Sequence, residues 1–349
     1  MRLGDMAERS FARHETFHPR YGWFRKAYAF AAADPYVFGS EDAPVTIGVG
    51  KNMVRAIRFW GMAAKLIAKR SHKPRASIVV PTMRGRALFG EQGWDPYMED
   101  PGTLWLLHWL LLAPPTQLPV WWLAFNEFHA VEFVDADLED AVITQLEAVA
   151  TWNMPHPSSV RKDISALLRT YAPASRSGRT SIDDILDCPL RELNLLGSSA
   201  TTDKYRFTLG PKPTLPSAIV AHAVLDYIDR TGTGGNTATI SRLAHEAGAP
   251  GRVFKLTETE LVAALQPMVE RSRALSLAAP AGVAQLSWSE DPATVATAIL
   301  DDYYESTGTE VCSGCLGDVP ISDLDATETD PMTSSRDAMS RAPVTSGVS

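Results

Sequence analysis

The sequence GVGKNMVRAIRFWGMAAKLIAK, residues 48–69, gives the clearest indication of fold in the N-terminal part of the chain. Its opening GVG predicts a turn, and the residues after it have the apolar spacing of one amphipathic helix. Lys51, Arg55 and Arg58 recur at spacings of four and three, so they share a face away from the apolar positions. Asn52 lies at the start of the same helix. Such a helix after a glycine-bearing turn is typical of a helix-turn-helix motif, whose second helix enters the major groove of DNA.

The segments on either side of this helix fit a winged helix-turn-helix domain. Residues 21–33 predict a helix that ends before Pro35, and a second short helix is expected over 40–46. A basic turn at 71–75 and a β-branched strand at 76–80 predict a wing, which in such domains touches phosphate or the minor groove. The alternative is a helical bundle whose surface is basic. The residues expected to contact DNA are Lys51, Asn52, Arg55, Arg58, Lys73, Arg75, Arg84 and Arg86.

The charge of the chain is divided unevenly along its length. Residues 1–90 contain 16 Lys and Arg against 6 Asp and Glu, and residues 91–349 contain 17 against 35, which together give the net charge of −8. The N-terminal quarter is therefore strongly basic although the whole chain is acidic. Clustered cations release counterions from a phosphate backbone whatever the rest of the chain carries. This distribution favours nucleic-acid binding by the N-terminal part.

The 349 residues are enough for two or three domains with hydrophobic cores. We predict a mainly α fold with short β wings. Residues 1–92 form a basic winged-helix DNA-binding domain, 93–212 a helical middle domain rich in tryptophan, and 213–305 a second, winged-helix-like interaction domain. Residues 306–349 are acidic and poor in large apolar groups, so they are predicted to be a disordered tail.

The cysteine content and the length of the apolar runs indicate the cellular compartment of the protein. Only Cys188, Cys312 and Cys315 are present, too few for the disulfide framework of a secreted protein of this size. The N-terminal residues lack the apolar stretch of a signal peptide, and the longest apolar run, 104–113, is too short to span a bilayer. We therefore expect a cytoplasmic protein without a membrane partner. Cys312 and Cys315 lack the second ligand pair of a zinc site, which favours a free or redox-active dithiol.

The middle of the chain supplies the candidate catalytic groups. Helices are predicted over 101–112 and 118–133, with most of their aromatic side chains in the core. On the second helix, His129 and Glu132 would lie three residues apart, where both could reach one metal ion or one proton-transfer centre. The alternative is a solvated helix edge. The candidate catalytic residues are Glu127, His129, Glu132 and Asp163, the last of which could instead form a surface ion pair with neighbouring cations.

The C-terminal part repeats the order of a winged helix. A helix is expected from Pro216, a short helix begins at Thr239, and a longer one over 256–274 carries a capping box of Thr257 and Glu260. Two strands, 275–278 and 284–288, would follow it. The supposed recognition helix is acidic and would repel phosphate, so we interpret this domain as a protein-contact or dimerisation module. The alternative is a DNA contact through Arg252 and Lys255.

Six stretches together resemble a known bacterial family, one first catalogued as a domain of unknown function. The resemblance covers about residues 12–305. The stretches are FHPRYGWFRKAY (17–28), GVGKNMVRAIRFW (48–60), GWDPYMEDPGTLWLLHW (93–109), FNEF (125–128), LLRTY (167–171) and GRVFKL (251–256).

That family includes the DNA-nicking component of the Ssp single-strand DNA phosphorothioation systems, which modify DNA with sulfur and defend against phage. The resemblance implies a protein that binds duplex DNA and cuts one strand, with Mg²⁺ or Mn²⁺ as the candidate cofactor. It also implies work with a cysteine desulfurase and an ATP-dependent sulfur-transfer enzyme. No catalytic residue of the family can be placed on this chain, because it shows no known nuclease motif.

Three hypotheses therefore stand. The first is a metal-dependent nicking endonuclease, which needs carboxylates that hold the cation against a phosphate oxygen. The second is a non-catalytic DNA-binding scaffold or transcriptional regulator that recruits the sulfur-transfer enzymes. Under each hypothesis a homodimer is a possible partner arrangement. The third is a transcription factor that binds a small molecule in its tryptophan-rich middle. Nicking of supercoiled plasmid in a metal series separates the first from the others.

Overall fold

The computed structural model describes residues 3–70, 78–173, 188–198, 204–232 and 235–307. The predicted wing residues Lys73 and Arg75 lie outside the described residues, as do Cys312, Cys315 and almost all of the predicted tail. In the described part α-helices dominate, and the strands form three small antiparallel sheets. The predicted class, mainly helical with small sheets, is thus confirmed.

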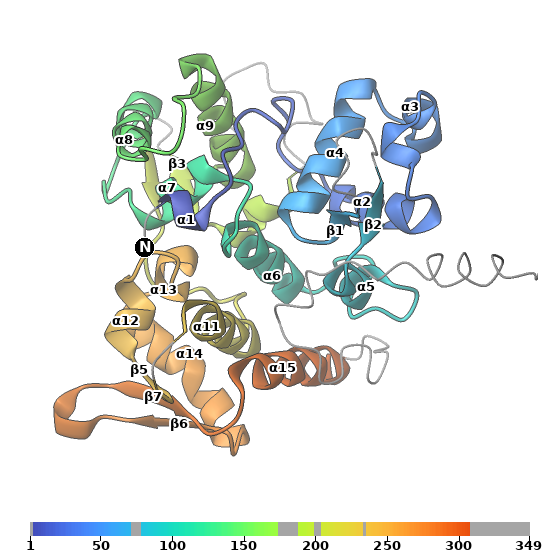
Figure 1. The fold of residues 1–349 in the computed structure, drawn as a ribbon. Helices are drawn as coiled ribbons and strands as arrows, with labels where there is room; N and C mark the ends of the chain where they lie inside the picture. Colours follow the sequence, from blue (N-terminus) through green and yellow to red (C-terminus); the bar gives the residue numbers. More distant parts are fainter. Residues whose placement is uncertain (1–2, 71–77, 174–187, 199–203, 233–234, 308–349) are drawn as a thin grey trace, which may run out of the picture.

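The elements follow one another along the chain as drawn in Figure 1. The α-helices are α1 (Leu3–Met6), α2 (Trp23–Ala33), α3 (Ala43–Ile47), α4 (Lys51–Ala63), α5 (Met83–Phe89), α6 (Pro101–Leu112), α7 (Pro119–Asn126), α8 (Asp135–Glu147), α9 (Pro157–Tyr171), α11 (Ser217–Thr231), α12 (Ile240–His245), α13 (Pro250–Phe254), α14 (Glu258–Arg271) and α15 (Pro292–Ser306). The strands are β1 (Ile67–Lys69), β2 (Val79–Pro81), β3 (Leu196–Ser198), β4 (Tyr205–Phe207), β5 (Thr237–Thr239), β6 (Leu275–Ala278) and β7 (Gln285–Trp288), and the 3₁₀ turns are Val37–Gly39, Pro189–Leu193 and Pro280–Gly282.

In the N-terminal part, α2 packs closely on α4. A Cβ atom built on Gly61 of α4 would lie 2.4 Å from Cβ of Ala27 in α2, so only glycine allows this approach. The helix predicted over 51–69 ends earlier, at Ala63, because Lys65 adopts a left-handed backbone with φ of 58°. The chain then turns into β1, which pairs antiparallel with β2 in a short hairpin.

The hairpin leads directly into a helix that the sequence did not predict. Thr82 caps α5 by accepting a hydrogen bond from the backbone N–H of Gly85. Arg84 and Arg86 are thus residues of a helix and do not flank the turn of a wing. Arg86 is exposed, whereas Arg84 is only 1% exposed and belongs to the interior.

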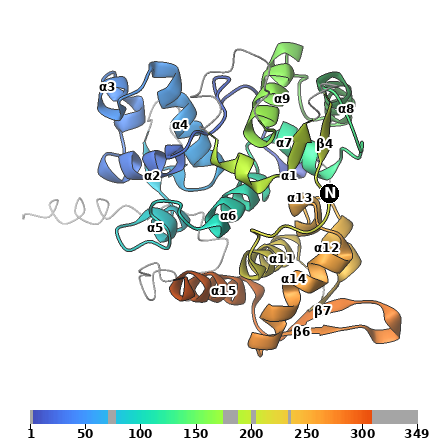
Figure 2. The ribbon, with the colours of Figure 1, turned by 180° about the vertical axis from the view of Figure 1, so that it is seen from behind.

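The middle of the molecule is built around α6, which lies between the N-terminal and C-terminal parts in both views (Figures 1 and 2). Every residue of α6 from Gly102 to Leu112 is buried. Its C-terminal end is held by Lys65, whose Nζ donates to the carbonyl oxygens of Leu110 and Ala113 at 2.8 and 2.7 Å. An ammonium group there also interacts favourably with the negative end of the helix dipole.

The helix predicted over 118–133 is wrong in its second half. It corresponds to α7, which ends at Asn126, and residues 127–133 are irregular up to the bridge between Phe133 and Tyr205. The side-chain oxygen of Asn126, the last residue of α7, accepts a hydrogen bond from the backbone N–H of Gly248 at 2.7 Å. The aromatic side chains of this region are buried in the core, as expected.

The C-terminal part packs α11 against α14 and α15 beside a sheet of three strands in the order β5-β7-β6 (Figure 1). The strand predicted over 275–278 is β6, and the one predicted over 284–288 is β7. The capping box of α14, Thr257 with Glu260, is present. No helix in the described ranges is long and apolar enough to cross a membrane.

Candidate nucleic-acid interface

The predicted cationic face of α4 lies on the surface. Lys51, Asn52 and Arg55 are exposed and Arg58 is half-buried, while Val54 on the opposite side is in the core. The separation follows from the helical repeat, which turns the apolar positions toward α2 and leaves the cations outside.

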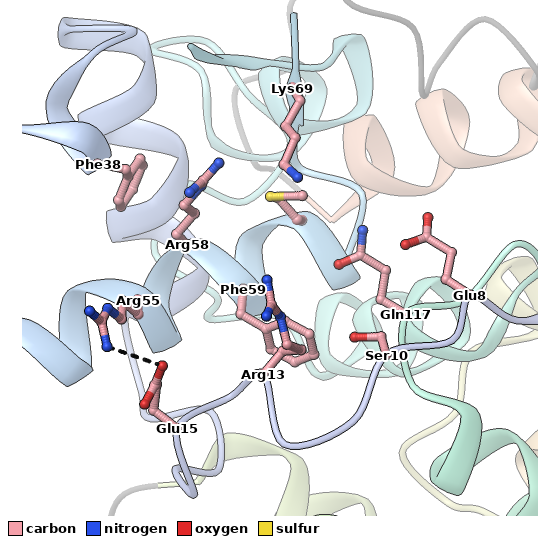
Figure 3. Close-up of a pocket in the computed structure, with 11 residues that line it drawn as sticks. Glu8, Ser10, Arg13, Glu15, Phe38, Arg55, Arg58, Phe59, Lys69 and Gln117 are labelled. Atoms are coloured by element: carbon pink, nitrogen blue, oxygen red, sulfur yellow. Dashed lines mark ion pairs between the residues drawn. The ribbon is translucent and has the colours of Figure 1, made fainter. Parts of the chain in front are cut away.

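A cavity of about 430 Å³ opens beside this face. Three parts of the chain supply its cations: Arg55 and Arg58 come from α4, Lys69 comes from β1, and Arg13 comes from the irregular segment before α2 (Figure 3). The remaining lining residues are Glu8, Ser10, Glu15, Phe38, Phe59, Met62 and Gln117.

The charges around the cavity are only partly neutralised. Arg55 pairs with Glu15, with 3.5 Å between Nη1 and Oε1, as the dashed line in Figure 3 marks. The side chains of Arg13, Arg58 and Lys69 make no ion pair or hydrogen bond with any residue that the structure describes. Burial lowers the pKa of Arg58, and the nearby charge of Arg13 lowers it further. Arg13, Arg58 and Lys69 therefore outnumber Glu8, the one lining carboxylate besides the Glu15 that pairs with Arg55, and guanidinium groups in such a site favour an anion.

A buried pair of side chains holds Arg13 in place. The carboxylate of Asp163, on α9, accepts hydrogen bonds from Nε2 of His14 at 2.7 Å and from the backbone N–H of Ala12 at 2.8 Å. These are the two neighbours of Arg13. Burial raises the pKa of Asp163, and the hydrogen bond from His14 opposes that rise. Ala12 has a φ of 52°, so the turn that points Arg13 into the cavity is a left-handed one that these bonds must stabilise.

Other contacts fix the same segment from both sides. Arg169 of α9 donates to the carbonyl oxygen of Thr16 at 2.6 Å, and Trp60 of α4 donates its indole N–H to the carbonyl oxygen of Phe17 at 3.1 Å. The ring of His14 stacks on Trp60, with 6.1 Å between ring centroids. The segment is thus clamped between α4 and α9.

A second cavity, of about 410 Å³, adjoins the first. The two share Glu8, Ser10 and Arg13, so the polar surface continues from α4 across the N-terminal segment to the start of α9. Arg9 and His156 add basic groups to this second cavity.

The predicted catalytic residues do not come together. Their proposed spacing required a helix through 133, which ends at Asn126, so His129 and Glu132 are not on one helical face. His129 lies 3.2 Å from Arg252, with its Nδ1 facing Nη1, and Glu132 pairs with Lys204 at 3.8 Å. Glu127 caps the C-terminal end of α7. Asp163 is buried and bonded to His14 instead of forming a surface ion pair.

The positions of these four residues also decide whether they could bind one metal ion together. The described residues contain no group of three or more His, Cys, Asp and Glu side chains that could hold one. Glu127, His129, Glu132 and Asp163 therefore do not fit a magnesium or manganese centre as they stand, and no catalytic step is assigned to them.

Arg13, Lys69 and the His14–Asp163 pair were not singled out from the sequence. Arg13 and His14 lie in a segment without periodicity, and Asp163 is 149 residues away from His14. The only sequence signal that included Arg13 and Lys69 was the excess of cations in residues 1–90.

The chain matches the model of a family described as "Protein of unknown function (DUF4007)" over residues 11–304. It is similar to a solved structure described as "SspB crystal structure", with 38% identity and a TM-score of 0.81, covering 87% of this chain and 90% of that one. It is also similar to a "Magnesium ion-bound SspB crystal structure", with 36% identity and a TM-score of 0.83, covering 93% and 94%. No curated protein matches the chain. The resemblance carried by the six sequence stretches is thus confirmed: the chain belongs to the DUF4007 family and is SspB-like in sequence and fold.

Proposed function

We propose that this protein is the duplex DNA-binding component of an Ssp-type DNA phosphorothioation system. The observation that carries the proposal is the cluster of cations around the first cavity, of which Arg13, Arg58 and Lys69 have no acidic partner among the described residues. Cations that have no acidic partner in the protein can neutralise phosphates of a polyanion. This favours binding, because it releases counterions from the phosphate backbone. The similarity to SspB structures supports placing that activity in sulfur modification of DNA.

In this proposal α3, α4 and the β1–β2 hairpin act as a winged helix-turn-helix. The exposed start of α4 would present Lys51, Asn52 and Arg55 to base edges in the major groove. The cations of the cavity would then contact phosphates of the adjacent DNA backbone. Phosphate contacts fix the position of the protein, and base contacts select the sequence.

We infer a different role for the C-terminal part. Its order of α11, β5, α12, α13, α14, β6 and β7, with the sheet order β5-β7-β6, is that expected of a second winged helix. The helix α14 begins with Glu258 and Glu260, which would repel a phosphate backbone. This domain would contact proteins: a second copy, or the cysteine desulfurase and the ATP-dependent sulfur-transfer enzyme of the same system in the cytoplasm.

A gel-shift titration tests DNA binding. In the double variant Arg55→Gln/Arg58→Gln we expect affinity for duplex DNA to fall at least about tenfold at low salt. The plot of log affinity against log salt should become less steep by about 0.9 for each phosphate that the variant no longer neutralises. The matched control is Arg271→Gln/Arg273→Gln, which removes the same charge from an exposed part of the C-terminal domain. Equal affinities for the wild type and the first variant would refute the recognition-helix assignment.

Nicking of one strand is the further activity that we propose. It is favoured by the similarity to a magnesium-bound SspB structure and by the family resemblance, and Mg²⁺ or Mn²⁺ would be its cofactor. Supercoiled plasmid incubated with the protein and each metal should be converted to open circles. Duplex binding without conversion under any metal would favour the alternative, a non-catalytic scaffold or regulator.

A further inference from the structure

The first cavity is larger than a phosphate group needs. Its volume of about 430 Å³ falls in the range of roughly 300–1,000 Å³ typical of pockets that enclose a small organic ligand. The cavity therefore has room for more of a nucleotide than its phosphate.

The lining combines cationic and aromatic side chains, which match the phosphate and the base of a nucleotide. Arg13, Arg58 and Lys69 supply positive charge. Phe38 and Phe59 supply flat apolar surface within the same cavity, and Figure 3 shows Phe38 beside Arg58 and Phe59 behind Arg13. Aromatic side chains stack on unpaired bases without regard to their identity.

Neutral polar groups complete the lining. Gln117 and Ser10 line the cavity opposite Phe38 and Arg58 in Figure 3. The Gln117 amide offers both donors and an acceptor, as recognition of the edge of a base requires. No hydrogen bond of this side chain to another described residue satisfies these groups.

Both aromatic residues line the cavity and are otherwise largely buried. Phe38 is 9% exposed and Phe59 is 8% exposed, so neither forms a surface patch. A base that remains stacked in a duplex cannot reach such rings, but a base rotated out of the helix can.

We propose that this cavity binds one nucleotide turned out of the DNA base stack. Its phosphate would contact Arg13, Arg58 and Lys69, and its base would lie against Phe38 and Phe59 with an edge toward Gln117. The inference rests on the proposed DNA-binding function and deepens it, because it makes a single unstacked nucleotide the ligand of the cavity.

Calorimetric titration of the full chain tests this with three probes: deoxyadenosine 3′,5′-bisphosphate, deoxyadenosine and inorganic phosphate. We expect the bisphosphate to bind at least about tenfold more tightly than either of the others. Phe38→Leu keeps apolar volume but removes the ring. It should weaken bisphosphate binding at least about fivefold, since stacking of one base contributes roughly 1–3 kcal/mol, and leave phosphate binding within about twofold.

Two further variants separate binding of the phosphate from binding of the base. Arg58→Gln should weaken both the bisphosphate and phosphate. Gln117→Ala changes a half-buried side chain, and it should weaken only the bisphosphate even if Phe38→Leu fails to fold. Phosphate binding as tight as the bisphosphate would show an anion site only and overturn the inference, as would no measurable nucleotide binding. Because duplex binding is measured separately by gel shift, a protein that binds duplex but not the nucleotide refutes this inference alone.

Discussion

Nε2 of His14 lies 2.7 Å from Oδ1 of Asp163, and the two side chains are only 1% and 4% exposed. The same carboxylate accepts from the backbone N–H of Ala12, so it is bonded to both neighbours of Arg13. Asp163 itself makes no ion pair with a surface cation in the described structure. We therefore regard Asp163 as a positioning residue, which acts on the anion site through the conformation of the segment that carries Arg13.

Asp163→Ala should lower the free energy of unfolding by about 1–3 kcal/mol, because it leaves a buried ring N–H and a backbone N–H without an acceptor. Duplex affinity should fall with it, since Arg13 loses its fixed position. Asp163→Asn retains an oxygen acceptor and should bind DNA nearly as well as the wild type. Urea denaturation and gel shifts measure the two effects.

The asparagine variant also separates positioning from catalysis. If nicking activity is lost in Asp163→Asn while DNA affinity is retained, the carboxylate takes part in the reaction and our assignment is wrong. Ser165→Ala, at an exposed position on the same helix, serves as the control for folding of α9.

Gly61→Ala should destabilise the N-terminal part. The new Cβ would lie 2.4 Å from Cβ of Ala27, so α2 and α4 must separate, and overpacking of this kind costs about 1–3 kcal/mol or more. Gly235→Ala is the control: this glycine lies outside any helix, before β5, without a left-handed backbone, and its added Cβ would meet no neighbouring atom within 4 Å. Thermal denaturation of the two variants should show a lower Tm for the first only.

Stability should decrease below neutral pH. Burial lowers the pKa of both His108 and His222 from 6.5 to about 4 in the folded chain. A histidine with a lowered folded pKa binds a proton more readily when unfolded, so its contribution is complete above pH 6.5 and is lost as the pH falls toward 4. Each should reduce the unfolding free energy by about 2 kcal/mol between pH 7 and pH 5.

Urea denaturation at the two pH values checks this, with His108→Gln and His222→Gln expected to reduce the difference. Replacing the exposed His129 by Gln should leave it unchanged. A wild-type free energy of unfolding that is the same at pH 5 and pH 7 would contradict the prediction.

The triple variant Glu127→Ala/His129→Ala/Glu132→Ala should retain any nicking activity that the wild type shows. These side chains face different partners, Arg252 for His129 and Lys204 for Glu132, and do not converge on one reacting centre. The rate at which the variant relaxes supercoiled plasmid should be within about twofold of the wild-type rate. Complete loss of nicking would show that these three side chains come together only when DNA is bound.

Local sequence patterns were sufficient for much of the secondary structure. The helix before Pro35, the start of α6 after Asp100, the capping box of α14 and the strand β6 were all predictable, because caps, prolines and apolar periodicity act within a few residues. The same reasoning extended two helices too far. The first ends at Ala63, shortly before Lys65 adopts a left-handed backbone, and the second ends at Asn126, whose side chain is bonded to Gly248 far along the chain.

The cationic face of α4 was determined by the sequence alone, since the helical repeat separates Arg55 and Arg58 from the apolar positions without help from the rest of the fold. The cavity beside it was decided only by tertiary structure. Arg13 reaches Arg58 because Asp163, far along the chain, accepts hydrogen bonds from the residues on both sides of it. An irregular segment has no repeat that could direct its side chains, so its conformation depends on the groups that it packs against.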